Sequence, residues 1–100
     1  MGNLIVKNGT AVMVIDTIEV TQKGQTVVKQ TGLNIPSGGT YSIPLQPGVY
    51  DATVTFRDPG GKTIQETKQV AITQEEDYIL EIYQVPEETK TSVPPNLTQG

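Results

Sequence analysis

The side chains of this 100-residue chain that could do chemistry are mainly its carboxylates, because the sequence contains neither histidine nor cysteine. The lack of histidine removes the commonest general base and transition-metal ligand, and the lack of cysteine removes the thiolate nucleophile. Two carboxylates can still catalyse glycoside hydrolysis when they flank one cleft. The candidates for such a pair are Asp16, Glu19, Asp51 and Glu81. A single small domain offers little room for a deep cleft, so we expect no enzymatic activity and no cofactor.

Two short segments resemble ligand-binding motifs. Gly60-Gly61-Lys62-Thr63 is similar to the end of a phosphate-binding loop, but Phe56 stands where that loop needs a further glycine, and the segment joins two expected strands. We therefore interpret it as a hairpin turn. Glu75, Glu76 and Asp77 are adjacent carboxylates that could bind calcium, although calcium ligands are usually spaced two residues apart or gathered from separate loops. A solvated turn is the favoured interpretation, and calcium binding stays open.

Exposed aromatic rings would point to sugar binding, because flat rings stack on the faces of sugars. The chain has no tryptophan, one phenylalanine and four tyrosines. We assign Phe56 and Tyr50 to the expected core, which leaves Tyr41, Tyr78 and Tyr83 as candidates for stacking. Carbohydrate binding through these three tyrosines is therefore the alternative function.

Composition and charge exclude further classes of partner. The net charge of −4 and the scattered positions of the seven cationic residues argue against nucleic acid and against an anionic membrane surface. The apolar runs, such as residues 11–15, are too short to span a bilayer, so we expect no membrane insertion. The first residues do not resemble a signal peptide. Localisation is therefore not assigned, and an extracellular or cell-surface site is favoured if the chain is a domain of a longer secreted protein.

Short alternating segments rich in Val, Ile and Thr favour strands over helices. The expected strands cover residues 4–6, 12–20, 25–33, 41–45, 50–56, 64–72 and 78–83, with turns rich in Gly and Pro between several of them. They predict an all-β fold, a single seven-stranded antiparallel two-sheet sandwich over residues 1–85. Residues 86–100 are rich in Pro and Thr and lack any periodicity, so we expect a flexible tail or linker there.

Local signals add detail to these strands. Asn8-Gly9 predicts a tight turn, and Asp58-Pro59-Gly60-Gly61 predicts a hairpin. The even-numbered apolar residues of 12–20 are expected to share one face, which Asp16 interrupts, so we expect a bulge there or a carboxylate at an edge. Residues 78–83 are apolar on both faces except for Glu81, which is typical of a central strand.

Three residues indicate which strands lie at sheet edges. Pro44 cannot donate a hydrogen bond to a sheet, so the strand at 41–45 is expected at an edge. Glu66 and Lys68 occupy the inward phase of the strand at 64–72, which indicates a bulge or an exposed edge.

The spacing of Leu45, Pro47, Gly48 and Tyr50 resembles the Leu-x-Pro-Gly-x-Tyr signature of prealbumin-like and Cna-B-like surface modules. It is also similar to the tyrosine corner of immunoglobulin-like and fibronectin III sandwiches. The resemblance implies an Ig-like or prealbumin-like sandwich in which the Tyr50 hydroxyl bonds to the backbone just upstream. It also implies an architectural or binding role.

Together these observations predict a non-catalytic β-sandwich module of a larger surface, secreted or virion protein. It would serve as a spacer, an assembly unit or a protein-binding domain. Its partner would be another protein, a neighbouring domain or an assembly partner, bound by strand addition to an exposed edge. The edge contacts are expected on the strands that carry Pro44 and the Glu66 and Lys68 pair.

Overall fold

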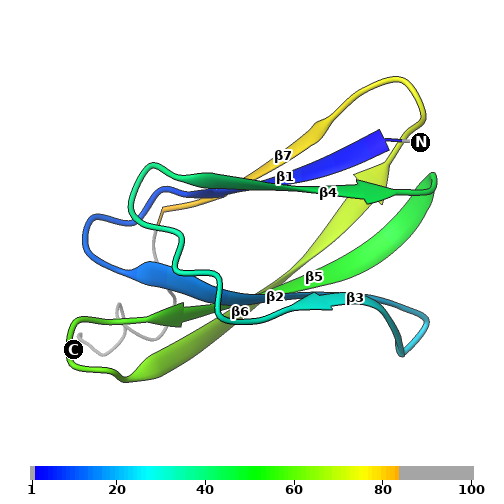
Figure 1. Cartoon of the computed structure of the whole chain (residues 1–100). Coiled ribbons are helices and arrows are strands. Elements are labelled where there is room, and N and C mark those ends of the chain that lie inside the picture. The colour runs from blue at the N-terminus through cyan, green and yellow to red at the C-terminus, as the bar shows by residue number, and fades with distance from the viewer. Residues whose placement is uncertain (1, 84–100) are drawn as a thin grey trace, which may run out of the picture.

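The computed structural model describes residues 2–83, and within that range the chain forms seven strands and no helix. The strands are β1 (Gly2–Asn8), β2 (Val14–Gln22), β3 (Gln25–Gln30), β4 (Thr40–Leu45), β5 (Gly48–Arg57), β6 (Thr63–Ile72) and β7 (Tyr78–Ile82). They lie in two facing layers (Figure 1), which confirms the predicted all-β two-sheet sandwich. The tail predicted at 86–100 lies outside the described residues.

One sheet has the strand order β4-β1-β7 and the other β3-β2-β5-β6. Every pair in these sheets is antiparallel except β1 with β7, which run parallel. The prediction of a fully antiparallel sandwich was therefore wrong at this pair. Turn signals predict antiparallel neighbours that a hairpin joins, whereas β1 and β7 are the two ends of the described fold and no hairpin connects them.

The connection from β1 to β2 is held by a buried asparagine. Asn8 is the last residue of β1 and is fully buried. Its Nδ2 donates to the carbonyl oxygens of Met13 (2.7 Å) and Ile35 (3.0 Å), and its Oδ1 accepts from the backbone N (3.0 Å) and the hydroxyl (2.6 Å) of Thr10. The predicted tight turn at Asn8-Gly9 was wrong, because β1 and β2 lie in different sheets and this segment crosses between them.

The predicted bulge near Asp16 is confirmed, because the pairing of β2 with β5 shifts by one residue between Ile15 and Thr17. The shift changes which residues face inward: the buried side chains on its two sides are Met13, Ile15, Ile18 and Val20. Val12, which the alternation placed on the core face, is 66% exposed. The extra residue at the bulge therefore puts the odd-numbered side chains inward before it, whereas the even-numbered side chains are inward after it.

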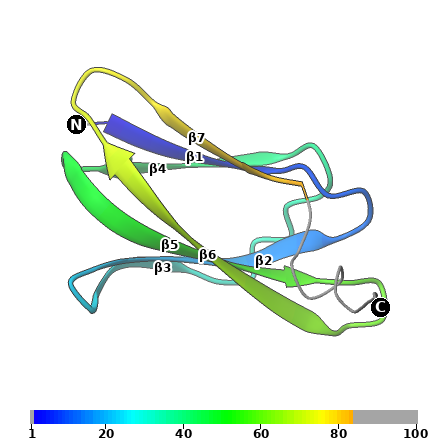
Figure 2. The ribbon, with the colours of Figure 1, turned by 180° about the vertical axis from the view of Figure 1, so that it is seen from behind.

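The core lies between the sheets, with its largest buried side chain, Phe56, on β5. Seen from behind, β6 diverges from β7 as the two strands run away from the loop that joins them (Figure 2). Ile64, Val70 and Ile72 of β6 are buried in the core, whereas its middle carries Glu66 and Lys68 on the same inward phase.

The β5–β6 hairpin forms at the predicted turn. The Asp58 carboxylate accepts from the backbone N of Gly60 and of Lys62, both at 2.9 Å, and Gly61 adopts a φ of 91° that favours glycine. The amides that a phosphate loop would aim at its ligand are thus bonded to the turn's own aspartate.

Candidate functional site

Tyr50 lies where the chain passes from β4 in one sheet to β5 in the other. Its ring is only 4% exposed, and its hydroxyl donates to the carbonyl oxygen of Gln46 at 2.7 Å, on the backbone just upstream. Leu45, the last residue of β4, is buried, and Gly48 has a φ of 156° that side-chain-bearing residues rarely adopt. Pro47 is exposed on the turn. The hydrogen bond from Tyr50 to Gln46 lies at the crossover between the sheets, and the buried tyrosine ring is not available to stack on a ligand.

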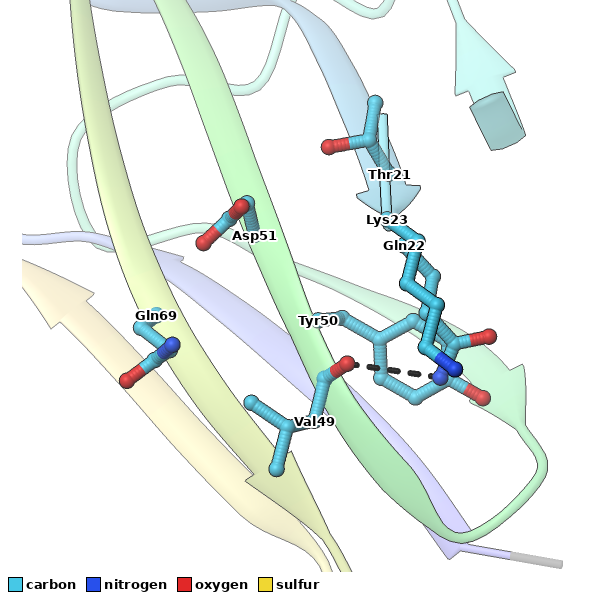
Figure 3. Close-up of a pocket in the computed structure, with 7 residues that line it drawn as sticks. All are labelled: Thr21, Gln22, Lys23, Val49, Tyr50, Asp51 and Gln69. Atoms are coloured by element: carbon cyan, nitrogen blue, oxygen red, sulfur yellow. Dashed lines mark hydrogen bonds between the residues drawn. The ribbon is translucent and has the colours of Figure 1, made fainter. Parts of the chain in front are cut away.

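A shallow hollow of about 320 Å³ lies beside this corner (Figure 3). Its lining consists of Thr21, Gln22, Lys23, Val49, Tyr50, Asp51 and Gln69, and Gln22 Nε2 donates to the Val49 carbonyl oxygen at 3.3 Å. The volume is at the lower end of the range for small-molecule sites. Among the described residues that line the hollow, only Lys23 and Asp51 are charged, and they carry opposite charges. The aromatic ring in this lining, that of Tyr50, is buried, so the lining does not indicate catalysis or sugar binding.

The candidate catalytic carboxylates are engaged in separate local contacts. Asp16 accepts from Arg57 Nη1 at 2.6 Å, Glu19 accepts from the Thr26 hydroxyl at 2.8 Å, and Asp51 stands in the hollow. Hydrogen bonds from Thr17 and Arg57 lower the pKa of Asp16, and the guanidinium charge adds to this shift. Glu81 lies in the other sheet from these three residues.

The described residues 2–83 contain no group of three or more carboxylates that could hold a metal ion. In the β6–β7 loop, Asp77 accepts a hydrogen bond from Asn3 Nδ2 at 3.1 Å. Its neighbours Glu75 and Glu76 are exposed.

The three tyrosines considered for sugar stacking do not form a platform. Tyr41 on β4 and Tyr78 on β7 are half-buried against the core, from opposite edges of the same sheet. Tyr83 is 66% exposed, and its hydroxyl donates to Glu81 Oε1 at 2.9 Å. That hydrogen bond and the negative charge of the carboxylate raise the pKa of Tyr83.

The two strands named from sequence as edges, β4 and β6, do lie at sheet edges, and each carries a feature that opposes pairing. Pro44 removes a backbone donor from β4. On β6, Lys68 Nζ lies 3.0 Å from Glu66 Oε2, and the side chain of Glu66 is only 10% exposed. Glu66 Oε1 is buried and has no hydrogen-bond partner among the described residues. Inward charges of this kind discourage a further strand from joining.

A third edge strand, β3, is interrupted by a bulge. Its pairing with β2 shifts between Val20 and Thr21, so that Val27 of β3 has no opposite residue and is 47% exposed. A bulge twists an edge strand and breaks its ladder of backbone groups, which also opposes pairing.

The fourth edge strand, β7, carries none of these features among its described residues. It contains no proline, its register against β1 is unbroken, and its one charged residue, Glu81, faces outward. The sequence prediction that this strand is central was wrong, because within residues 2–83 β7 has only β1 as a neighbour. The prediction rested on apolar residues on both faces of the strand, which are typical of a strand covered on both sides. Ile79, on the outward face, is instead 63% exposed.

The backbone groups on the free side of β7 follow from its pairing with β1. The backbone N of Gly9 donates to the carbonyl oxygen of Ile82 at 2.9 Å, so the carbonyl of Ile82 points toward β1. Backbone groups of successive strand residues point to alternate sides. Leu80 and Tyr78 therefore also bond toward β1, and Ile79 and Glu81 present their N–H and C=O groups to the free side.

The outward face next to this free edge is apolar and locally neutral. Ile79 is paired with Ile5 of β1, and in the neighbouring pair Lys7 Nζ lies 3.7 Å from Glu81 Oε2. We call Ile5, Lys7, Ile79, Glu81 and Tyr83 the β7 edge surface. A strand that joined β7 would find backbone groups that no residue of 2–83 pairs, an exposed isoleucine, and a Glu81 carboxylate that Lys7 compensates.

No helix that could cross a membrane occurs between residues 2 and 83. Comparison of the chain with protein-family models, with curated proteins and with solved structures returned no significant match.

Proposed function

We propose that this chain is a non-catalytic β-sandwich module of a larger surface, secreted or virion protein, and that it serves as an assembly unit or protein-binding domain. It binds by accepting a partner strand on β7. The observation that carries this proposal is that the other three edge strands each contain a feature that opposes pairing, whereas β7 contains none and exposes Ile79.

The energetics of strand addition support a contact of moderate strength. The free side of β7 offers the N–H and C=O groups of Ile79 and Glu81, and each backbone hydrogen bond contributes about 0.5–1.5 kcal/mol net. Covering the exposed side chain of Ile79 adds an apolar contribution of about 1–2 kcal/mol. These gains are offset in part by the ordering of the partner strand, so we expect reversible binding.

The strand order supports the prealbumin-like alternative over the Ig-like one. In a constant-type immunoglobulin domain the first strand lies beside the second, in a sheet with strands B, E and D. Here β1 lies between β4 and β7, and β2 lies in the opposite sheet. We therefore propose the prealbumin-like type. Tyr50 is the tyrosine of the Leu-x-Pro-Gly-x-Tyr signature that resembles this type. We do not extend the proposal to carbohydrate, because Tyr41 and Tyr78 pack against the core.

The proposal is tested with a display library of random peptides selected on the immobilised chain. We expect the selected peptides to protect the amides of Ile79 and Glu81 from hydrogen exchange. Ile79→Pro removes the free-side N–H without removing a hydrogen bond to β1, so it should abolish binding, whereas the matched variant Ile79→Val keeps the N–H and should bind normally. Selected peptides that bind Ile79→Pro as well as the unmodified chain would refute strand addition at β7.

A further inference from the structure

We infer that the partner strand is β7 of a second copy of this chain, and that the two copies pair antiparallel about a two-fold axis. The inference rests on the proposed function, since it uses the same free edge. It goes further by naming the partner and the register of the pairing.

Backbone alternation restricts how two β7 strands can pair. In an antiparallel pair, residues whose backbone groups point across the interface lie opposite one another. On β7 these residues are Ile79 and Glu81, as the hydrogen bond from Gly9 to Ile82 establishes. A two-fold axis can therefore place Ile79 opposite Ile79, Glu81 opposite Glu81, or Ile79 opposite Glu81 with Leu80 on the axis.

Charge selects among these three registers. Glu81 opposite Glu81 brings two carboxylates together directly. Ile79 opposite Ile79 shifts the strands so that Asp77 lies opposite Glu81, which again opposes two carboxylates. Like charges directly opposite one another destabilise a strand pair. The register centred on Leu80 avoids both, because it places Ile79 opposite Glu81 and Tyr78 opposite Ile82.

This register also fits the outward face of β7. Each Glu81 keeps its own Lys7 at 3.7 Å and gains Ile79 of the second copy as its opposite neighbour. The two Ile79 side chains, each 63% exposed in the single chain, become diagonal neighbours, and each has Ile5 of its own copy beside it, so the four isoleucines form a diagonal apolar band. The Lys7–Glu81 pair of each copy is neutral as a whole. The charges beside the isoleucines therefore add nothing to the net charge of −4 that the chain carries.

On the inward face, Leu80 of one copy lies opposite Leu80 of the other. Leu80 belongs to the hydrophobic core, so the contact extends the apolar layer of one sandwich toward that of its neighbour. The two three-stranded sheets become one six-stranded sheet in the order β4-β1-β7 followed by β7-β1-β4 of the second copy. A two-fold interface requires a patch that complements itself, and the β7 edge surface meets that requirement.

Disulfide cross-linking tests the register directly, because the natural chain has no cysteine. Leu80→Cys places two thiols opposite each other at a pair without mutual hydrogen bonds, where Cα atoms lie about 4.5 Å apart, within reach of a disulfide. Ile82→Cys is the matched control on the same face. The two Ile82 residues are about 13 Å apart along the strand direction in this register. We expect Leu80→Cys to form a covalent dimer under mild oxidation and Ile82→Cys to stay monomeric.

Sedimentation of the unmodified chain provides a second measurement that needs no core substitution. We expect a concentration-dependent monomer–dimer equilibrium. Ile79→Pro removes one donor from each copy and should weaken it about thirtyfold, whereas Ile79→Val should leave it unchanged. If Leu80→Cys fails to fold, as its amide spectrum would show, the comparison of the two Ile79 variants decides.

The results separate the inference from the proposed function. Equal cross-linking of both cysteine variants, or a dimer that Ile79→Pro does not weaken, would overturn the register and the interface. A chain that remains monomeric but binds library peptides at Ile79 and Glu81 would overturn the second copy as partner and leave strand addition standing. A monomeric chain that also binds no peptide at β7 would overturn both.

Discussion

Replacing Tyr50 by Phe removes one hydroxyl from the corner between the sheets and leaves the rest of the ring in place. The hydroxyl donates to the carbonyl oxygen of Gln46 at 2.7 Å, and the ring is 4% exposed. Gln46 itself is exposed and this hydrogen bond is only partly buried, so we expect water to reach the carbonyl after the substitution. The loss should therefore lie near the net value of one hydrogen bond, about 1 kcal/mol, rather than at the full cost of an unsatisfied buried group.

This loss is measurable by urea unfolding. The midpoint should fall while the slope m stays the same, because the surface exposed on unfolding does not change. In thermal unfolding a loss of about 1 kcal/mol corresponds to a decrease in Tm of about 4–8 °C for a domain of this size.

Tyr41→Phe is the matched control. Tyr41 is half-buried against the core, less buried than Tyr50, and its hydroxyl makes no hydrogen bond among the described residues. We expect it to change stability by less than about 0.5 kcal/mol. If Tyr50→Phe is no more destabilising than Tyr41→Phe, the hydroxyl does not stabilise the crossover and the corner interpretation fails.

Three further predictions concern stability away from the corner. Asn8→Ala should destabilise the chain by about 3 kcal/mol in urea unfolding, because it removes the buried hydrogen bonds to the Met13 and Ile35 carbonyls and leaves the Thr10 amide without its acceptor; a loss under about 1 kcal/mol would contradict the network. Glu66→Leu should raise the urea midpoint by roughly the equivalent of 1 kcal/mol, since it removes a buried carboxylate oxygen that has no partner among residues 2–83, and an unchanged or lower midpoint would show that this carboxylate is satisfied. The pKa of Asp16 is lowered in the folded chain, so its stabilisation is present above the unfolded pKa near 3.8 and is lost as pH falls through the folded pKa. Arg57→Gln should therefore destabilise the chain near pH 7 and much less near pH 2, and a loss that is equal at both pH values would exclude the ion pair as its cause.

The features that were predictable from sequence are those set by a few neighbouring residues. The hairpin at Asp58 follows from an aspartate that bonds the amides of its own turn. The bulge at Asp16 follows from a carboxylate in the middle of an apolar alternation, which the fold resolves by a register shift that lets Arg57 reach it. In both cases the physical cause lies within the local pattern of the chain.

The features that sequence reasoning missed depend on which strands become neighbours. Asn8-Gly9 has the composition of a tight turn, but the buried amide of Asn8 is used to bond Met13 and Ile35. Residues 78–83 are apolar on both faces, and periodicity cannot reveal that Ile79 is left uncovered. The β7 edge surface could not be predicted from sequence for this reason. Proline and inward charge do identify edge strands in a sequence, but Pro44 and Glu66 mark edges that oppose pairing.

The corner and the free edge lie in different parts of the sandwich, and this separation allows stability and binding to be tested apart. Tyr50 acts where β4 passes to β5, whereas β7 is the opposite edge of the sheet that contains β4. Ile79 faces outward, and its backbone groups point away from β1, so substitutions there change neither the corner hydrogen bond nor the ladder between β1 and β7. Tyr50→Phe should lower the urea midpoint and leave dimerisation unchanged. Ile79→Pro should weaken dimerisation and leave the urea midpoint unchanged. These two results together would assign an architectural role to Tyr50 and a role in recognition to Ile79.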